Sequence, residues 1–185
     1  PVLVDQYLMG KELEVDVISD GTDVLIPGVM QHIERTGVHS GDSIAVYPPF
    51  SIGDKMLQTI VDCSEKLALA LGTKGLVNIQ YLVYQGELFV IEVNPRASRT
   101  APFVSKATGV PLPRLATQVM LGKTLKELDP WSMRRSGYVS VKESVFPFRR
   151  FPGVDIILGP EMHSTGEVMG MGSDFPEAYY KSQLA

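Results

Sequence analysis

The sequence predicts an α+β domain with a mostly antiparallel sheet flanked by helices. Residues 12–18 alternate between polar and apolar side chains, as a strand does, and residues 51–71 repeat apolar side chains at helical spacing. Two further strand-like runs, 76–84 and 88–93, are separated only by a short turn around Gly86. This order of strands, helix, hairpin, helix and strand is typical of antiparallel α+β domains.

The amino-terminal third predicts three strands and a loop. Residues 2–8 and 24–26 are rich in Val, Leu and Ile, so each run predicts a strand. The strict alternation over residues 12–18 predicts a half-buried strand. The acidic face of that strand consists of Glu12, Glu14 and Asp16. Residues 36–43 are small and polar, so they predict a loop.

The clearest predicted helix covers residues 51–71. Ser51 is a suitable N-cap, and Asp54 occupies the position of the acid in a capping box. Gly72 is expected to end the helix, because glycine readily adopts the left-handed conformation found after helix ends.

The carboxyl-terminal part predicts a helix over residues 113–121, a strand over 138–146 and a terminal helix over 176–184. Residues 170–172, Gly-Met-Gly, match neither the dinucleotide-binding pattern nor the P-loop pattern. We therefore expect a turn there.

Composition and charge restrict the class of function. The chain has 185 residues, enough for one compact domain, and a net charge of -4 with acids and bases intermixed. A nucleic-acid surface would need a basic excess, so no nucleic-acid partner is expected. The single cysteine, Cys63, excludes an internal disulfide and is expected to be a structural thiol.

The sequence contains no run with the length of a membrane span and no visible signal peptide. We therefore expect no membrane partner and a cytoplasmic location. The chain enters strand-like sequence without an initiator Met, which indicates a segment of a longer protein.

A group of charged and amide side chains ends the second strand of the hairpin. Glu92 and Asn94 are two residues apart on a strand, so their side chains point to one face, about 7 Å apart. Two such oxygen ligands suit Mg²⁺, which takes few protein ligands and completes its shell with waters and phosphates. Arg96 and Arg99 follow in the next loop, and their guanidinium groups fit phosphoryl oxygens. Each residue alone is unremarkable at a strand end, but the four together favour a phosphoryl-transfer site.

The hairpin register decides whether Gln80 joins this group. An odd loop over residues 85–87 would place Gln80 opposite Glu92 and Asn78 opposite Asn94. A two-residue loop would turn the Gln80 side chain to the other face. Turn chemistry permits both lengths, and a metal site that includes Gln80 predicts the odd loop.

Residues 37–43, GVHSGDS, form a second candidate site. Their glycines allow close approach of the backbone, His39 offers a donor, and Ser40 offers a hydroxyl and an amide. Taken alone, such a loop is more often a surface turn.

Several stretches together resemble carbamoyl phosphate synthase. VNIQYLV (77–83), LFVIEVNPRASRT (88–100) and PFVSKATGVPL (102–112) are similar to its ATP-grasp halves. The EVNPR element occurs widely in ATP-grasp ligases, whereas SKATG and GVHSGDS are more particular to this synthase. Residues 140–170 resemble the end of the second ATP-grasp half of the large subunit, the half that phosphorylates carbamate. The similarity covers essentially all 185 residues.

The resemblance implies that residues 1–185 form a single partial ATP-grasp domain, its carboxyl-terminal lobe. The glycine-rich lid, the upstream nucleotide-binding arginines and the C-terminal allosteric domain would lie outside it. The implied activity is ATP-dependent phosphorylation of carbamate to carbamoyl phosphate, with Mg²⁺ or Mn²⁺ as cofactor and K⁺ as a further cation. This step would belong to carbamoyl phosphate synthesis from bicarbonate and glutamine-derived ammonia, for pyrimidine and arginine biosynthesis.

The implied partners are the remainder of the large subunit and a glutamine amidotransferase small subunit, and the isolated segment is expected to be inactive. Two alternatives stay open. One is a different ATP-grasp carboxylate–amine ligase, and the other is a non-catalytic ATP-grasp module.

The resemblance also implies a role for particular residues. The metal ligands would be Gln80, Glu92 and Asn94, with Glu92 bridging two ions. The catalytic residues would be Arg96 and Arg99, together with Glu92 and Asn94. The phosphate and carbamate end of the site would be formed by Gly37, Val38, His39 and Ser40. Adenine would contact Leu8, with Gln6 and Met9 beside it. Ribose would contact Glu12, and K⁺ would lie near His32 and Glu12. At the position of Gln6, the family also carries His or Glu.

Overall fold

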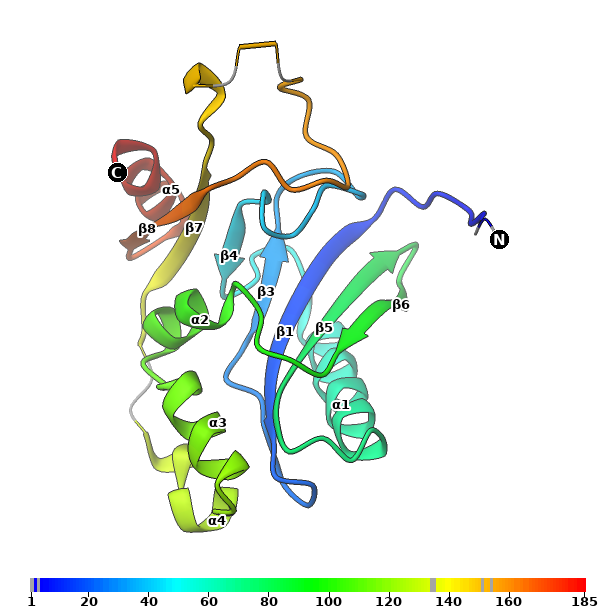
Figure 1. Ribbon diagram of the computed structural model, residues 1–185, viewed down its shortest axis with the longest axis vertical. Helices are drawn as coiled ribbons and strands as arrows, with labels where there is room; N and C mark the ends of the chain where they lie inside the picture. The colour runs from blue at the N-terminus through cyan, green and yellow to red at the C-terminus, as the bar shows by residue number, and fades with distance from the viewer. Residues whose placement is uncertain (1, 3, 134–135, 151, 154) are drawn as a thin grey trace.

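The computed structural model describes residues 2, 4–133, 136–150, 152–153 and 155–185, which form one eight-stranded antiparallel sheet with helices packed on it (Figure 1). The strand order is β6-β5-β1-β3-β4-β7-β8, and β2 pairs with the end of β1. The strands are β1 (Lys11–Ser19), β2 (Val24–Leu25), β3 (Val29–His32), β4 (Ala45–Tyr47), β5 (Gly75–Tyr84), β6 (Glu87–Asn94), β7 (Val139–Val145) and β8 (Gly166–Gly172). The helices are α1 (Asp54–Ala70), α2 (Ala101–Thr108), α3 (Leu112–Met120), α4 (Leu125–Leu128) and α5 (Phe175–Leu184), with 3-10 turns at Pro130–Ser132 and Phe148–Arg150. The predicted fold class and antiparallel sheet are confirmed.

Strand β1 is buried on both faces, which corrects the prediction of a half-buried strand. Its apolar residues pack with Ile60 of α1, and Ile18 at its far end packs against α2 and α3. The three acids on its other face are also buried: Glu12, Glu14 and Asp16 are 8%, 2% and 0% exposed. The alternation therefore separates an apolar face from a buried polar face, because other segments cover the acids.

Helix α1 confirms the predicted helix but not its predicted cap. Gly53 is the N-cap residue, and no side chain caps the helix. The side chain of Ser51 instead accepts a hydrogen bond from Gln31 Nε2 at 2.8 Å, and the backbone N–H of Ser51 donates to Gln31 Oε1 at 3.1 Å. Gly72 follows the helix with φ +60°, as expected for a residue that ends it.

The β5–β6 hairpin differs from both predicted alternatives. Its turn consists of two residues, Gln85 and Gly86, with φ 51° and 82°, so the predicted odd loop is wrong. Gln80 nevertheless pairs with Glu92, because a β-bulge between Gln80 and Tyr81 shifts the register. The extra residue on the β6 side is Ile91, which has no partner in the ladder. The bulge therefore restores the pairing that the metal-site hypothesis requires.

The amino-terminal segment does not form the predicted strand. Residues 2 and 4–10 have irregular backbone, and residue 3 lies outside the described residues. The segment is attached to Thr36 instead: the Tyr7 hydroxyl donates to the carbonyl oxygen of Thr36 at 2.7 Å, and the Gly10 N–H donates to Thr36 Oγ1 at 3.1 Å.

The carboxyl-terminal elements include the predicted helix, strand and terminal helix as α3, β7 and α5. The predicted turn at residues 170–172 is wrong, because these residues belong to β8. The glycines serve packing there: a Cβ at Gly170 would overlap the backbone of Ala178 and Ser182 in α5. Between β7 and β8, the described residues of the segment 146–165 form an arm that projects from the body (Figure 1).

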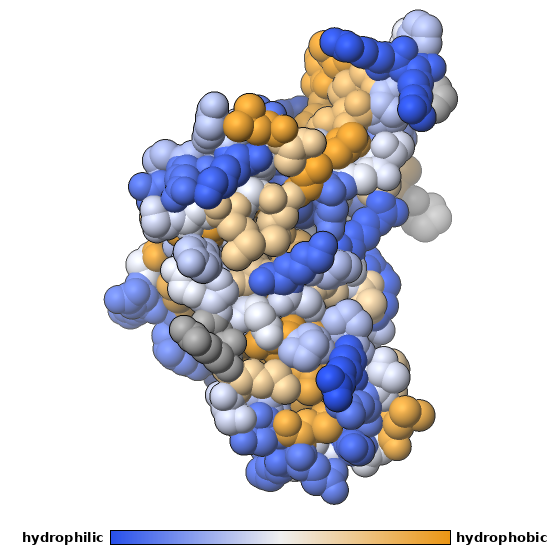
Figure 2. Space-filling model, turned by 90° about the vertical axis from the view of Figure 1, so that its left-hand side faces the viewer, coloured by the Kyte–Doolittle hydropathy of each residue, from blue (hydrophilic) through white to orange (hydrophobic). Residues whose placement is uncertain are grey.

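The arm carries hydrophobic side chains next to charged ones at one end of the molecule (Figure 2). Ile156 and Ile157 are 69% and 68% exposed, and Phe146 stacks on Phe148 with ring centroids 5.1 Å apart. Exposed apolar residues of this kind are typical of a segment that contacts other parts of a larger assembly.

We predict that Gly170→Ala lowers the free energy of unfolding by about 1–3 kcal/mol, because overpacking would displace α5 from β8. Chemical denaturation of the 185-residue chain measures the change. The matched control is Gly166→Ala in the same strand, where the new Cβ would meet only Val145 Cβ at 3.9 Å. Equal effects of the two substitutions would contradict this account of the packing.

Candidate functional site

A polar cavity of about 230 Å³ lies where the ends of β5 and β6 meet the loop before α2. Six of the predicted site residues line it: His39, Ser40, Gln80, Glu92, Arg96 and Arg99. Five residues that were not predicted as ligand contacts line it as well: Glu14, Gly41, Asn78, Ser98 and Thr100. The structure therefore brings together segments that are far apart in the sequence.

The hairpin presents two amides and a carboxylate on one face. Asn94 Nδ2 donates to Glu92 Oε1 at 2.8 Å, and Gln80 is the cross-strand partner of Glu92. Across the cavity, Gln80 Nε2 donates to Ser40 Oγ at 3.4 Å. The three side chains lie close enough to act on one ligand.

This donor set fits a divalent cation that also binds phosphate. Within the described part of the chain, no group of three or more His, Cys, Asp or Glu side chains could hold a metal. A site here must therefore include the amide oxygens of Gln80 and Asn94 beside the carboxylate of Glu92. Few protein ligands of this kind suit Mg²⁺ or Mn²⁺. Rotation of the Asn94 amide would direct its oxygen toward a cation held by Glu92.

Arg96 and Arg99 extend from the loop at residues 95–100 and are exposed. Arg96 Nη1 donates to the carbonyl oxygen of Ala97 at 3.2 Å, and Arg99 Nη1 contacts Met162 Sδ. Neither guanidinium forms an ion pair with a described carboxylate. Both cations therefore remain available to an anionic ligand.

The loop at residues 37–42 is held from the side of β7. The ammonium of Lys142, which is 1% exposed as a residue, donates to the carbonyl oxygen of Ser40 at 3.2 Å. Burial lowers the pKa of Lys142 below its ordinary value, although nearby carboxylates oppose this effect. Ser144 Oγ donates to the carbonyl oxygen of Gly41 at 2.8 Å. These bonds fix the backbone beside the cavity.

The returning limb of the arm holds the same loop from the other side. The N–H groups of His163 and Ser164 donate to the carboxylate of Asp42 at 2.8 and 2.9 Å. The N–H of His39 donates to the carbonyl oxygen of Gly159 at 2.8 Å. The loop that resembles a surface turn in the sequence is therefore tied into the fold at several points.

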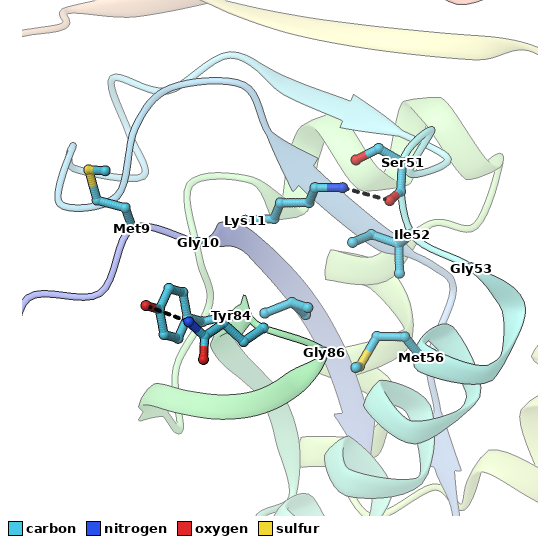
Figure 3. A pocket seen from close by; sticks show the side chains of 11 residues that line it. Met9, Gly10, Lys11, Ser51, Ile52, Gly53, Met56, Tyr84 and Gly86 are labelled. Atoms are coloured by element: carbon cyan, nitrogen blue, oxygen red, sulfur yellow. Dashed lines mark hydrogen bonds between the residues drawn. The ribbon is translucent and has the colours of Figure 1, made fainter.

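Some predicted ligand contacts do not line the polar cavity. Gln6 and Met9 are exposed and Leu8 is half-buried in the irregular amino-terminal segment. Met9 lines a different cavity of about 630 Å³, together with Ile52 and Met56 (Figure 3). That cavity lies on the α1 side of the sheet, and its lining mixes apolar side chains with Lys11, Tyr84 and Gln85. Lys11 Nζ donates to the carbonyl oxygen of Ser51 at 2.9 Å. The assignment of the adenine contacts stays a prediction.

The carboxylate of Glu12 contacts other residues of the fold. Its Oε1 accepts a hydrogen bond from the N–H of Gly37 at 3.0 Å, and its Oε2 lies 3.5 Å from His32 Nδ1. On the other side, His32 Nε2 lies 3.2 Å from Glu14 Oε2. Burial acts to lower the pKa of His32, but the close contacts with both glutamates and their negative charges outweigh it and raise the pKa to about 9. Ribose and K⁺ contacts at Glu12 and His32 stay predictions, as do contacts of Gly37 and of the buried Val38.

A buried polar cluster, formed by Glu14, Asp16, Asn78 and Thr100, forms one wall of the cavity, to which all but Asp16 contribute. Each of these residues is at most 2% exposed. Burial, followed by the negative charge of Glu14, raises the pKa of Asp16 to about 6. Burial acts in the same direction on Glu14, but His32, Asn78 and Thr100 together lower the pKa of Glu14 below its ordinary value. The acidic face of residues 12–18 was the available signal for this cluster.

An antiparallel sheet that brings a carboxylate, two amides and two arginines to the end of one hairpin defines the carboxyl-terminal lobe of an ATP-grasp domain. The fold is similar to that of the biotin carboxylase domain of a single-chain bacterial carboxylase, with a TM-score of 0.63 and 18% sequence identity. That similarity covers 74% of this chain and 33% of the other.

The chain belongs to the family described as carbamoyl-phosphate synthase L chain, ATP binding domain, whose sequence profile matches residues 1–128. It is 56% identical to the carbamoyl phosphate synthase large chain of Clostridium beijerinckii, over 98% of this chain and 17% of the relative. The large chain of Archaeoglobus fulgidus is 56% identical over 100% of this chain and 17% of its own length. That of Rhodopirellula baltica is 57% identical over 100% and 18%. The chain thus spans about one sixth of these relatives. Among the described residues, no helix has the length and apolarity needed to cross a membrane.

We predict that Asp16→Asn changes the pH dependence of stability. Because the pKa of Asp16 is about 6 in the folded chain and about 3.9 in an unfolded one, the wild type loses stability as pH rises from about 4 to about 6. The variant lacks this titration. The stability of the variant relative to the wild type should therefore rise by up to about 3 kcal/mol between pH 4 and pH 7.

Urea unfolding at a series of pH values measures this difference. Asp5→Asn, at an exposed position, reports the effect of removing a carboxylate from the surface. A stability difference for Asp16→Asn that stays constant between pH 4 and pH 7 would contradict the raised pKa.

Proposed function

We propose that this chain forms part of an ATP-dependent ligase and that its site phosphorylates carbamate to carbamoyl phosphate. The observation that carries the proposal is the shared cavity of Gln80, Glu92, Arg96 and Arg99, with Asn94 bonded to Glu92. Membership of the carbamoyl-phosphate synthase family supports the ATP-dependent reaction. The sequence resemblance of residues 140–170 to the second ATP-grasp half favours the carbamate step.

In this proposal the residues position the reactants and stabilise charge. Glu92, Asn94 and Gln80 would hold the metal ions, which would screen the β- and γ-phosphates and favour transfer of the γ-phosphoryl group. Arg96 and Arg99 would place positive charge around the transferred group as its bond to ADP breaks and its bond to the carbamate oxygen forms. Phosphoryl transfer of this kind depends mainly on position and electrostatics rather than on protein acids and bases.

The backbone at residues 37–40 would contact the phosphate and carbamate end. His39 Nδ1 accepts a hydrogen bond from the Gly41 N–H at 3.0 Å, so in the neutral ring the proton lies on Nε2, which is free to donate to an anionic oxygen. Ser40 offers its hydroxyl opposite Gln80. The two groups line the same cavity as the arginines.

The remaining parts of the reaction would come from outside this chain. The rest of the large subunit would supply the lid and the upstream arginines, and a glutamine amidotransferase subunit would supply ammonia for carbamate formation from bicarbonate. We place the reaction in the cytoplasm, where its product would enter pyrimidine and arginine biosynthesis.

We predict that Glu92→Gln in the full-length chain lowers carbamate-dependent phosphoryl transfer by about 100-fold or more, because the carboxylate charge that would hold the metal ions is lost. Synthesis of ATP from carbamoyl phosphate and MgADP measures the step in reverse. Glu87→Gln, at an exposed position on the same strand, is the matched control and should retain activity. Near-normal ATP synthesis by Glu92→Gln would refute the proposed site.

We also predict that the 185-residue chain alone binds MgATP with a Kd weaker than about 1 mM and has no ligase activity, because one side of the nucleotide site would be missing. Isothermal titration calorimetry measures the affinity. Low-micromolar binding would show that this lobe holds the nucleotide without the rest of the large subunit.

A further inference from the structure

Thr100 lies at the junction of the arginine-bearing loop and α2. It is 2% exposed, follows Arg99 directly and occupies the N-cap position of α2. Its side chain makes no hydrogen bond that caps the helix. The hydroxyl points instead into the buried polar cluster.

The Thr100 hydroxyl joins the loop to the central strand. Thr100 Oγ1 lies 2.9 Å from Glu14 Oε1 and 2.9 Å from Asp16 Oδ2. Asn78 Nδ2 on β5 reaches the same two carboxylates, at 2.7 Å from Glu14 Oε1 and 3.0 Å from Asp16 Oδ1. Ser98 Oγ lies 2.8 Å from Thr100 Oγ1 and accepts a hydrogen bond from the N–H of Ala101 at 2.9 Å. One end of the loop is therefore bonded to β1, through two carboxylates that Asn78 of β5 also bonds.

The other end of the loop is fixed to β6. The N–H of Arg96 donates to the carbonyl oxygen of Asn94 at 2.8 Å. Between the two anchors, the guanidinium groups of Arg96 and Arg99 have no described carboxylate as an ion-pair partner. The positions of both guanidiniums in the cavity thus depend on how the backbone of residues 95–100 is held.

Stability alone does not account for the cluster. Two carboxylates at positions that are 2% and 0% exposed lose their hydration, and apolar side chains of similar volume are often at least as stable in such places. A network of directed hydrogen bonds does provide what apolar packing lacks, namely a single geometry for the segment attached to it.

We propose that Thr100, held by Asp16 and Glu14, is a positioning residue that sets Arg96 and Arg99 at the transferred phosphoryl group. Thr100 would not touch the substrate. The inference rests on the proposed function of the site. It adds a residue that would keep the two arginines at a fixed position relative to Glu92 and Asn94 at the end of β6.

The test uses the full-length chain with Thr100→Val, which keeps the shape of the side chain and removes the hydroxyl. We expect kcat for ATP synthesis from carbamoyl phosphate and MgADP to fall by about 100-fold, because a displacement of roughly 1 Å can have this effect on a reaction that depends on position. The KM for MgADP should change by less than about threefold, since the nucleotide would be bound by other residues. Thr100→Ser restores the hydroxyl and should recover most of kcat.

Thr108→Val is the matched control. Thr108 is fully buried in α2, and its hydroxyl donates to the carbonyl oxygen of Val104 at 2.7 Å, away from the loop. This variant should keep kcat within about threefold of the wild type, as expected for a residue remote from the reacting groups. Ser98→Ala is the second variant if Thr100→Val fails to fold, and it should lower kcat by about tenfold for the same reason.

Amide hydrogen exchange over residues 96–100 gives a readout that is independent of activity. Faster exchange in Thr100→Val but not in Thr108→Val supports the anchoring role. The inference is overturned if exchange is unchanged, if Thr100→Val keeps its kcat, or if Thr108→Val loses as much. A wild-type chain that makes no ATP from carbamoyl phosphate would refute the proposed function, whereas the exchange result would still decide the claim about the loop.

Discussion

The register between β5 and β6 is the constraint on which the rest of the site depends. In an antiparallel pair, a slip of one residue turns a side chain to the opposite face of the sheet. The two-residue turn at Gln85 and Gly86 would by itself direct Gln80 away from Glu92. The bulge at Ile91 takes up one residue and returns Gln80 to the side of Glu92. Since β6 is at the end of the strand order, the bulge disturbs the ladder on one side only.

The sequence predicted those elements whose periodicity is long and regular. The alternation over residues 12–18 and the apolar spacing over 51–71 each extend over several repeats, so β1 and α1 could be recognised. The run 2–8 has strand-like composition, but its described residues form no strand, and the Tyr7 hydroxyl bonds Thr36 in the loop instead. Strand β8 was missed because its glycines indicate a turn locally, and only the approach of α5 explains them.

In the candidate site, too, the residues that could be predicted are those that lie close together in the sequence. Glu92, Asn94, Arg96 and Arg99 could be found because they are neighbours in the sequence and their chemistry is complementary. The buried polar cluster could not be predicted from the sequence, because it joins β1, β5 and the loop that ends at Thr100. These segments meet only when β1 pairs with β5. An acid on alternate positions of a strand has the same pattern whether it faces water or a buried amide, so burial of Asp16 depends on the tertiary fold.

The charges of the buried residues next to the cavity explain why an anion could bind close to the acids of β1. Within the described residues, His32 lies between Glu12 and Glu14 at 3.5 and 3.2 Å, and its raised pKa means that it carries a positive charge at neutral pH. One of those two negative charges is thereby offset within the fold. The raised pKa of Asp16 further reduces the negative charge close to the loop, because a fraction of that carboxyl is protonated near neutrality.

Glu92 is then the carboxylate that reaches the cavity from an exposed position, opposite the exposed guanidiniums of Arg96 and Arg99. A polyphosphate approaching this surface would meet two cations directly and the Glu92 carboxylate through a metal ion. The buried acids serve to hold the backbone, and the positive charge of His32 offsets part of the negative charge that they would present to the ligand.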